Sequence, residues 1–461
     1  MIGYIDSKEK ESRFQFTYEN GMLTIYFNDS LPFDDTRRSL ENEIKTTQPF
    51  LMGKNAMTNE NVVFFVDEAP FATKHEIGWT SSSYCVDYYL ALKQSAEPTS
   101  FEKLVFEFPE LDVFFDLSHG YRSEYNEKSF SFRTIPWEKT KQRFSFIVNE
   151  KDISCEITVS QTFRSYSNTP LILKSRLGCE FETTSDISLI MGIYATIKRL
   201  FCFLCFRKNV NIGAIGLYGK YVDGRRSKIG ELFILFDNEM STESDKVIQK
   251  IVEYKYVRRQ LSLLAQLVAN DKLYFEHIPN SDYESHHLTV ARIILNTAAF
   301  EWTFSQLYEG LLLSERRAKV KDDILSALDD ISVQKGYNSK SKSELKRYIK
   351  IISSVDYSLS EKIRHAFIEC DTILSDFVKN IRQINSMKEE EYYQIAERIQ
   401  AQRNAFAHGN IDREIDDDTV MDAVVLEWLN YAITLKCAGY NDNEIFNIIN
   451  RVFGRRFADR N

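Results

Sequence analysis

Hydrophobic and polar residues alternate along much of the first half of the chain. The clearest case is FQFTYENGMLTIYF, residues 14–27, where every second residue on each side of Asn20-Gly21 is apolar. Asn-Gly is the dipeptide that a type I′ turn prefers, so this stretch predicts a β-hairpin. Further runs of the strand type follow at residues 61–68, 104–110, 143–160 and 171–182. Together these segments predict an antiparallel, mostly β region with aromatic faces.

A long apolar segment interrupts this pattern at residues 187–206, ISLIMGIYATIKRLFCFLCF. Ser185 or Asp186 can cap a helix that begins here. The segment is almost long enough to span a bilayer, but Lys198 and Arg199 lie together near its middle. Charges at that depth are costly in lipid, so we expect a buried or amphipathic helix and not a membrane span. Short strands are then predicted over 212–222 and 231–237.

Apolar residues recur at helical spacing from about residue 243 onward. Helices are predicted over 243–271, 288–331, 345–355, 360–384, 389–408, 418–439 and 443–453. The Lys- and Ser-rich stretch 332–344 is predicted to be an exposed loop between them. Several helices with short connections indicate an antiparallel bundle. The expected fold class is therefore α+β, with a β-rich domain over 1–245, a helical connector over 246–284 and a helical bundle over 285–461.

Composition places the chain among folded globular proteins: 43% of the 461 residues are hydrophobic and 27% are charged. The formal net charge of −9 gives no overall attraction to nucleic acid or to anionic lipid, so a nucleic-acid site must be a local basic patch. The first residues, MIGYIDSKEKESRF, do not resemble a secretory signal, and a cytoplasmic protein is expected.

Residue types that often carry metal or cofactor chemistry do not form a recognisable set. Seven cysteines are scattered along the chain without a disulfide pattern, and Cys202 and Cys205 form a single CxxC on an apolar helix, where core packing is favoured. His286-His287 precedes a helix and is expected at the surface or in a capping role. The glycines of residues 213–219 lack the order of a nucleotide-binding loop. We expect neither a metal nor a cofactor.

The stretch AQRNAFAHGN, residues 401–410, is the one remaining candidate for chemistry. Its Arg403 to His408 spacing is close to what chance gives. At about 100° per residue, Asn404 and His408 lie about 40° apart on one face of a helix, whereas Arg403 and His408 lie about 140° apart. One straight helix cannot easily aim both at one atom, but two such helices around a twofold axis can. The geometry favours a site shared by two subunits.

RNAFAH resembles the RxxxxH signature of HEPN domains, which are helical bundles that often act as metal-independent ribonucleases. The resemblance covers roughly residues 285–455. A β-rich half followed by such a bundle resembles the ApeA family of bacterial anti-phage proteins, and NTAAFEWTF, residues 296–304, is similar to an early bundle helix of that family. The resemblance implies attack of a ribose 2′-OH on the adjacent phosphate of RNA, with tRNA as a candidate substrate. It also implies a homodimer, a phage-derived trigger and regulation by the first domain.

Histidine exchanges protons near neutral pH, and the donors of arginine suit a phosphate that gains charge. His408 is therefore assigned to proton transfer, Arg403 to phosphate binding and Asn404 to orientation, while Glu301 is carried over from the resemblance as an acidic group facing the same cleft. Candidates for an RNA path are Arg413, Lys379 and Arg382. Two alternatives stay open: Arg403 and His408 make only structural hydrogen bonds, or the bundle is a non-catalytic dimerisation module that binds RNA or protein.

Overall fold

The computed structural model describes most of the chain, in ranges separated by short gaps. These ranges are 1–6, 13–28, 50–67, 69–76, 79–93, 96–126, 129–166, 168–221, 224, 226–235, 243–309, 315–334, 337–353, 357–409 and 415–460. The chain forms two compact units. Unit 1 contains residues 1–271, 278–285 and 451–455, and unit 2 contains residues 272–277, 286–450 and 456–461. Strands lie in unit 1 and the long bundle helices lie in unit 2, so the α+β fold class is confirmed.

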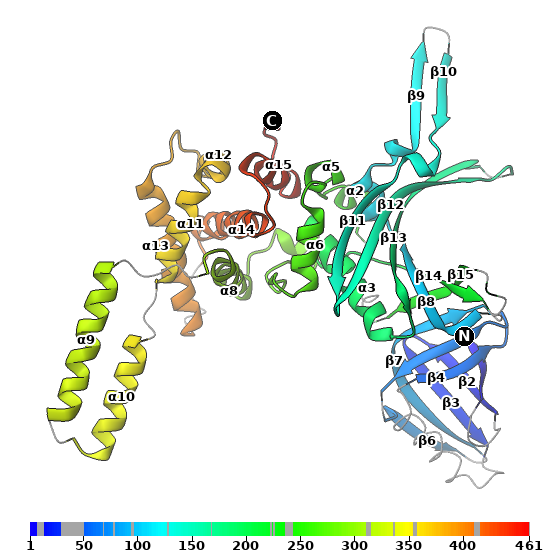
Figure 1. The fold of residues 1–461 in the computed structure, drawn as a ribbon, viewed down its shortest axis with the longest axis horizontal. Helices are drawn as coiled ribbons and strands as arrows, with labels where there is room; N and C mark the ends of the chain where they lie inside the picture. The colour runs from blue at the N-terminus through cyan, green and yellow to red at the C-terminus, as the bar shows by residue number, and fades with distance from the viewer. Residues whose placement is uncertain are drawn as a thin grey trace. The chain divides into compact units, whose positions relative to one another are not determined.

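Unit 1 is built on one antiparallel sheet, in the order β11-β12-β13-β8-β14-β15-β7-β3-β2-β1-β4-β5 with β6 beside β7, and on a separate β9-β10 hairpin (Figure 1). The strands are β1 Ile2–Asp6, β2 Arg13–Glu19, β3 Met22–Asn28, β4 Phe50–Asn55, β5 Asn61–Val66, β6 Ala72–Glu76, β7 Trp79–Leu92, β8 Ala96–Phe106, β9 Tyr121–Asn126, β10 Ser129–Thr134, β11 Gln142–Val148, β12 Lys151–Phe163, β13 Leu171–Thr184, β14 Ile215–Tyr221 and β15 Arg226–Ile234.

The sheet closes on itself through β7. This strand pairs with β3 along its first half and with β5 along its second half, so β7, β3, β2, β1, β4 and β5 form a closed circuit. Alternate residues of these strands point inward, as the period of two requires. They fill the interior with apolar side chains, among them Phe16, Ile25 and Phe64, none of which is exposed to solvent.

The hairpin predicted at residues 14–27 is confirmed. β2 and β3 pair from Gln15 with Tyr26 to Glu19 with Met22. Asn20 and Gly21 form the turn with φ of 49° and 77°. A type I′ turn needs positive φ at both central residues, and the sequence provides the two residue types that adopt it at low cost.

The apolar segment forms α3, Ile187–Cys205, and Asp186 caps it by accepting a hydrogen bond from the Ser188 backbone N–H at 2.8 Å. Within the described residues α3 is the one helix long and apolar enough to cross a membrane, and it is mostly buried inside the protein. Lys198 is also buried, and its ammonium donates to the Val210 carbonyl, while Arg199 pairs with Asp271. Both central charges therefore have protein partners.

The remaining helices of unit 1 are short. They are α2 Pro109–Phe115, the 3-10 turns η1 Leu117–Gly120 and η2 Trp137–Lys139, α4 Asp245–Ile248, α5 Tyr254–Val257, α6 Leu261–Ala269 and α7 Asp282–Ser285. The single helix predicted over 243–271 is thus wrong, because the chain breaks twice. The first break lets the adjacent side chains of Ile251 and Val252 both enter the core. Most of the expected connector belongs to unit 1, where α6 packs on α3 and β11.

Unit 2 is helical throughout its described residues. Its helices are α8 Val290–Leu307, α9 Glu315–Gln334, α10 Ser339–Ser353, α11 Leu359–Glu369, α12 Asp371–Arg382, α13 Glu389–Ala407, α14 Asp417–Cys437 and α15 Asp442–Val452, whose last two residues belong to unit 1. The most buried is α14, which packs against α8, α12 and α13. Trp428 near its middle is fully buried.

The exposed loop predicted over 332–344 is wrong for most of that stretch, because α9 continues to Gln334 and α10 begins at Ser339. The side chain of Asn338 accepts a hydrogen bond from the backbone N–H of Ser341 at 2.9 Å, which is the geometry of an N-terminal cap. The local abundance of Lys and Ser suggested a loop, but a capped helix tolerates both on its solvent face.

A buried ion pair links α8 to α14. The Arg292 guanidinium lies 2.7 Å from the Glu427 carboxylate, and only 5% of the Glu427 side chain is exposed. One turn further along α8, the buried side chain of Asn296 donates to the Ala423 carbonyl at 3.0 Å. Burial raises the pKa of Glu427 to about 7, and Arg292 opposes this shift only in part.

Candidate active site

Helix α13 carries the RNAFAH residues and is held in the bundle by one face. The buried residues recur at helical spacing and are Tyr392, Ile395, Ala396, Ile399, Gln402 and Phe406. Its last turn presents Asn404, Ala407 and His408 to solvent. The polar residues of the motif therefore lie where a substrate or a second subunit can reach them.

Phe406 anchors the end of this helix. Its side chain is 4% exposed and packs in one cluster with Ile293 of α8 and Ala423 of α14. Gln402, one turn earlier, is also buried, and its amide donates to the hydroxyl of Thr419 on α14. These two contacts fix the rotation of α13 about its axis. They therefore fix the directions in which Arg403 and His408 leave the helix.

The helix ends at His408. This residue has φ of −91° and ψ of 11°, and its backbone N–H donates to the Asn404 carbonyl at 3.1 Å. Gly409 follows with φ of 86°, a left-handed conformation that glycine adopts without a steric penalty. Gly-Asn after the last residue of a helix is a sequence signal for its C-terminus, and Gly409 ends α13 in this way. Asn410 lies outside the described residues.

Arg403 extends toward α8. Its Nη1 donates to the side-chain oxygen of Asn404 at 3.2 Å, and its Nη2 lies 3.9 Å from an oxygen of Glu301. The Arg403 side chain is 40% exposed and that of Glu301 is 36% exposed. An ion pair this long and this exposed contributes little to stability. Arg403 is thus positioned, but it keeps donors that a phosphate can use.

Lys362 was not anticipated from the sequence. It lies in the first turn of α11, and its ammonium is 3.9 Å from the second carboxylate oxygen of Glu301. A Ser358-to-Glu361 capping box, which the sequence displays as SxxE, fixes where α11 begins. That local signal can place Lys362 on the helix, but no local signal predicts which helix faces it. Glu301 therefore lies between two cations, Arg403 and Lys362.

The structure brings three of the four expected residues together. Arg403, Asn404 and Glu301 are in contact, as described above. The side chain of His408 makes no hydrogen bond or ion pair with the described part of the chain. No hydrogen bond links Arg403 to His408 within the described part of one chain, and the angle of about 140° between them remains an expectation from their helical spacing.

The residues considered for an RNA path are committed to ion pairs. Lys379 lies 2.6 Å from Asp376, and Arg382 lies 3.1 Å from Asp418 and also contacts Asp422. Asp422 is completely buried and takes a second cation, Arg398, at 2.8 Å. Arg382 therefore balances the buried charge of Asp422, which weakens the case for it as a phosphate contact, whereas the pair of Lys379 with Asp376 is exposed. Arg413 lies outside the described residues.

Metal-binding groups do not converge anywhere among the residues that the structure describes: no three His, Cys, Asp or Glu side chains form a possible metal site there. Cys202 and Cys205 are both buried, and burial raises the pKa of the Cys205 thiol well above its usual value. His286 and His287 are exposed before α8. The cap of that helix is Thr289, whose hydroxyl accepts a hydrogen bond from the Arg292 backbone N–H at 3.2 Å.

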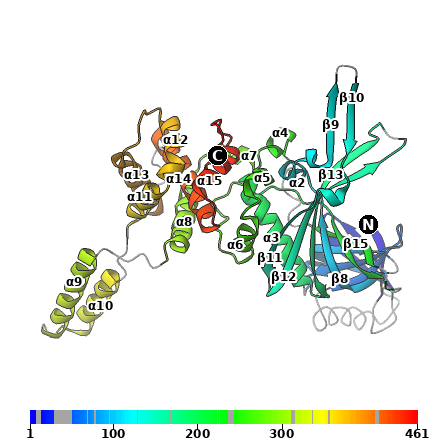
Figure 2. The ribbon, with the colours of Figure 1, turned by 45° about the horizontal axis from the view of Figure 1, so that its top comes forward.

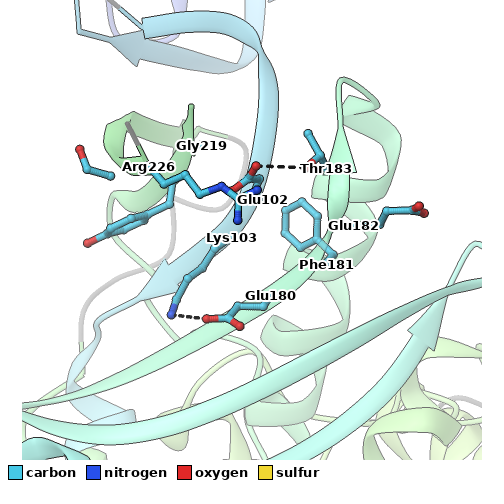
Figure 3. A pocket seen from close by; sticks show the side chains of 10 residues that line it. Glu102, Lys103, Glu180, Phe181, Glu182, Thr183, Gly219 and Arg226 are labelled. Atoms are coloured by element: carbon cyan, nitrogen blue, oxygen red, sulfur yellow. Dashed lines mark hydrogen bonds and ion pairs between the residues drawn. The ribbon is translucent and has the colours of Figure 1, made fainter. Parts of the chain in front are cut away.

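Unit 1 contains a polar pocket of about 490 Å³ (Figure 3). It forms where the pairing of β13 with β8 becomes irregular between Glu180 and Thr184. Four of the charges that line it pair with one another: Lys103 with Glu180 at 2.8 Å, and Arg226 with Glu102 at 3.2 Å. Glu182, which also lines it, pairs with Lys151 at 2.8 Å. Nothing in its lining matches the chemistry expected of the RNAFAH residues.

Comparison with known proteins adds no relatives. No protein-family model, no curated protein and no solved structure matches this chain.

Proposed function

We propose that the protein is a metal-independent endoribonuclease of the HEPN type. The observation that carries the proposal is the last turn of α13, where Arg403, Asn404 and His408 lie at the surface on a helix whose rotation is fixed by buried Phe406. His408 is exposed and has no side-chain partner among the residues that the structure describes, and Arg403 is only loosely paired with Glu301, so both side chains are accessible to a ligand. The arrangement suits acid–base chemistry on an anionic substrate.

In the proposed reaction, the 2′-OH of a ribose loses its proton and attacks the adjacent phosphorus, and the 5′-oxygen of the next nucleotide leaves. His408 accepts and returns the proton. Arg403 donates hydrogen bonds to the phosphate oxygens as their charge increases, and Asn404 and Glu301 hold Arg403 in position. Because helical spacing predicts that Arg403 and His408 point about 140° apart within one chain, the proposed site combines residues of two subunits around a twofold axis.

The biological role proposed is cytoplasmic anti-phage defence by abortive infection. A ribonuclease that is always active would harm its own cell. We therefore assign to unit 1 the task of restraining unit 2 until a phage-derived trigger is present. The polar pocket of unit 1 is one place where such a signal could bind. This assignment rests on the likeness of the two-part architecture to the ApeA family.

Cleavage of purified tRNA and total RNA in EDTA tests the proposal. The wild-type chain should produce fragments that end in a 2′,3′-cyclic phosphate, while His408→Ala and Arg403→Ala should produce none. Gln394→Ala, an exposed position on the same helix, is the matched control and should cleave normally. RNA retention without cleavage would favour the alternative, a non-catalytic binding module. Activity that EDTA abolishes would point to a metal-dependent hydrolase.

A further inference from the structure

Helices α9 and α10 form a hairpin that lacks a core of its own. They lie side by side in both views of the molecule (Figures 1 and 2). None of the side chains described in either helix is buried. Isolated helices of this length are marginal in water, and stable helical pairs depend on a packed apolar face. The hairpin therefore needs a further surface to pack against.

Each helix carries two apolar rows. The first row is partly buried between the helices and includes Leu325 and Leu328 of α9 and Leu345 and Ile349 of α10. The second row is exposed and consists of Val320 (50%), Ile324 (43%), Tyr348 (57%) and Ile351 (52%).

The second row forms one face of the hairpin. At about 100° per residue, each member of the second row lies roughly 40° to 160° around the helix axis from the members of the first row, and the rotation has the same sense on both helices. Because the helices are antiparallel, that rotation carries both pairs to the same side. Residues equally far from the connection lie at the same level, so Val320 is level with Ile351 and Ile324 with Tyr348. These four side chains define what we call the apolar face.

Charged residues flank the apolar face with opposite signs. The outer edge of α9 carries Asp323 and Asp330 with one cation, Lys319, and the outer edge of α10 carries Lys340 and Arg347, all of them exposed. Arg347 also lies 4.0 Å from Glu344 of its own helix, a long contact between two exposed groups. Asp323 is level with Arg347, and Asp330 is level with Lys340. The two edges point away from each other, so these charges cannot pair across one hairpin.

We propose that the apolar face is covered by the same face of a second copy of this chain. If the twofold axis runs parallel to the helices, each α9 faces the α10 of the other copy in a four-helix bundle. This arrangement buries both apolar faces and places Asp323 opposite Arg347 of the partner subunit, and Asp330 opposite the partner subunit's Lys340. A perpendicular axis would instead place α9 against α9, with its acidic edges together. The interface is argued from α9 and α10 alone and does not depend on ribonuclease activity.

Cross-linking of the full-length chain tests this interface. Asp323→Cys and Arg347→Cys are made in separate chains, mixed, and treated with a short bismaleimide. The mixture should give a covalent dimer well above the background of the native cysteines, while each variant alone should not. Asp322→Cys, on the opposite face of α9, is the matched control and should not link to Arg347→Cys.

Adding Tyr348→Asp to the Arg347→Cys chain places a charge in the apolar face and should lower the yield of the cross-linked dimer by about tenfold. Circular dichroism should show unchanged helix content in the full chain. Three results would overturn the proposal: no cross-link in the mixture, an equal cross-link through Asp322→Cys, or self-linking of Asp323→Cys, which would indicate α9 against α9.

Discussion

Arg403 Nη2 lies 3.9 Å from the Glu301 carboxylate, at the place where α13 meets α8. Because the distance is long and both groups are partly exposed, the contact with Glu301 orients the Arg403 side chain but contributes little to the stability of the fold. Replacing Glu301 by alanine should change the free energy of unfolding by less than about 1 kcal/mol. If Glu301 orients Arg403 for phosphate binding, RNA cleavage should fall clearly. Glu397→Ala on α13 is a control that should leave cleavage intact, and equal cleavage by the two variants would remove Glu301 from the site.

Phe406 offers a separate test of how the motif is positioned. Phe406→Ala should lower the free energy of unfolding by about 3–5 kcal/mol, because it removes a buried ring and leaves a cavity. Cleavage should be lost even at temperatures where the variant remains folded, since the end of α13 is no longer fixed. Urea unfolding and an RNA assay on the same preparation measure the two effects. Phe406→Leu should recover most of both, and a fully active Phe406→Ala would show that the rotation of α13 is not critical.

The left-handed Gly409 ends the helix directly after His408. Gly409→Ala should cost roughly 1–2 kcal/mol, because a β-carbon disfavours a φ of 86°. Gly409→Asn should cost less, since asparagine adopts this conformation more readily. Thermal unfolding ranks the three proteins. If the rates of RNA cleavage by the three proteins follow the order of their melting temperatures, the backbone at residue 409 contributes to the placement of His408. Identical melting temperatures would contradict the prediction, because they would mean that the turn adapts to a β-carbon at residue 409 without cost.

The buried Glu427 makes the stability of unit 2 depend on pH. Its pKa of about 7 in the folded chain lies above its ordinary value of 4.5. The folded state therefore holds the proton more tightly, and the stability contributed by the neutral carboxyl is present below about pH 4.5 and lost as pH rises to about 7. Relative to Glu427→Gln, the wild-type chain should lose about 3 kcal/mol over this interval. Denaturant unfolding of both proteins from pH 4.5 to 8 measures it, and parallel curves would contradict it.

Local signals in the sequence were sufficient to predict the turns and helix ends whose conformation depends only on neighbouring residues. Asn20-Gly21 identifies its turn, Asp186 its helix cap and Gly409 the end of α13, because each acts through the conformation of a few adjacent residues. The face of α13 that is buried also follows from its apolar spacing. The separation of Arg403 from His408 could be stated from helical geometry alone.

Contacts between segments far apart in the chain could not be predicted from these local signals. The closure of the sheet through β7 depends on which strands meet, and Lys362 approaches Glu301 only because α11 and α8 pack together. The first break in the helix predicted over 243–271 is accompanied by burial of both Ile251 and Val252 in the core. In each case a contact between remote parts of the chain outweighs local preference.

The division of the chain into its two units has a consequence for the order of events during synthesis. β15 completes its pairing with β7 across more than a hundred residues of intervening chain, from Leu92 to Gly230, and such distant contacts form slowly. Residues 451–455 also belong to unit 1, where the Phe453 and Phe206 rings pack edge to face with centroids 4.8 Å apart. Unit 1 therefore cannot be finished until the ribosome has translated the whole of α13 and α14. On this view a nascent chain displays the RNAFAH residues before the unit proposed to restrain them is complete.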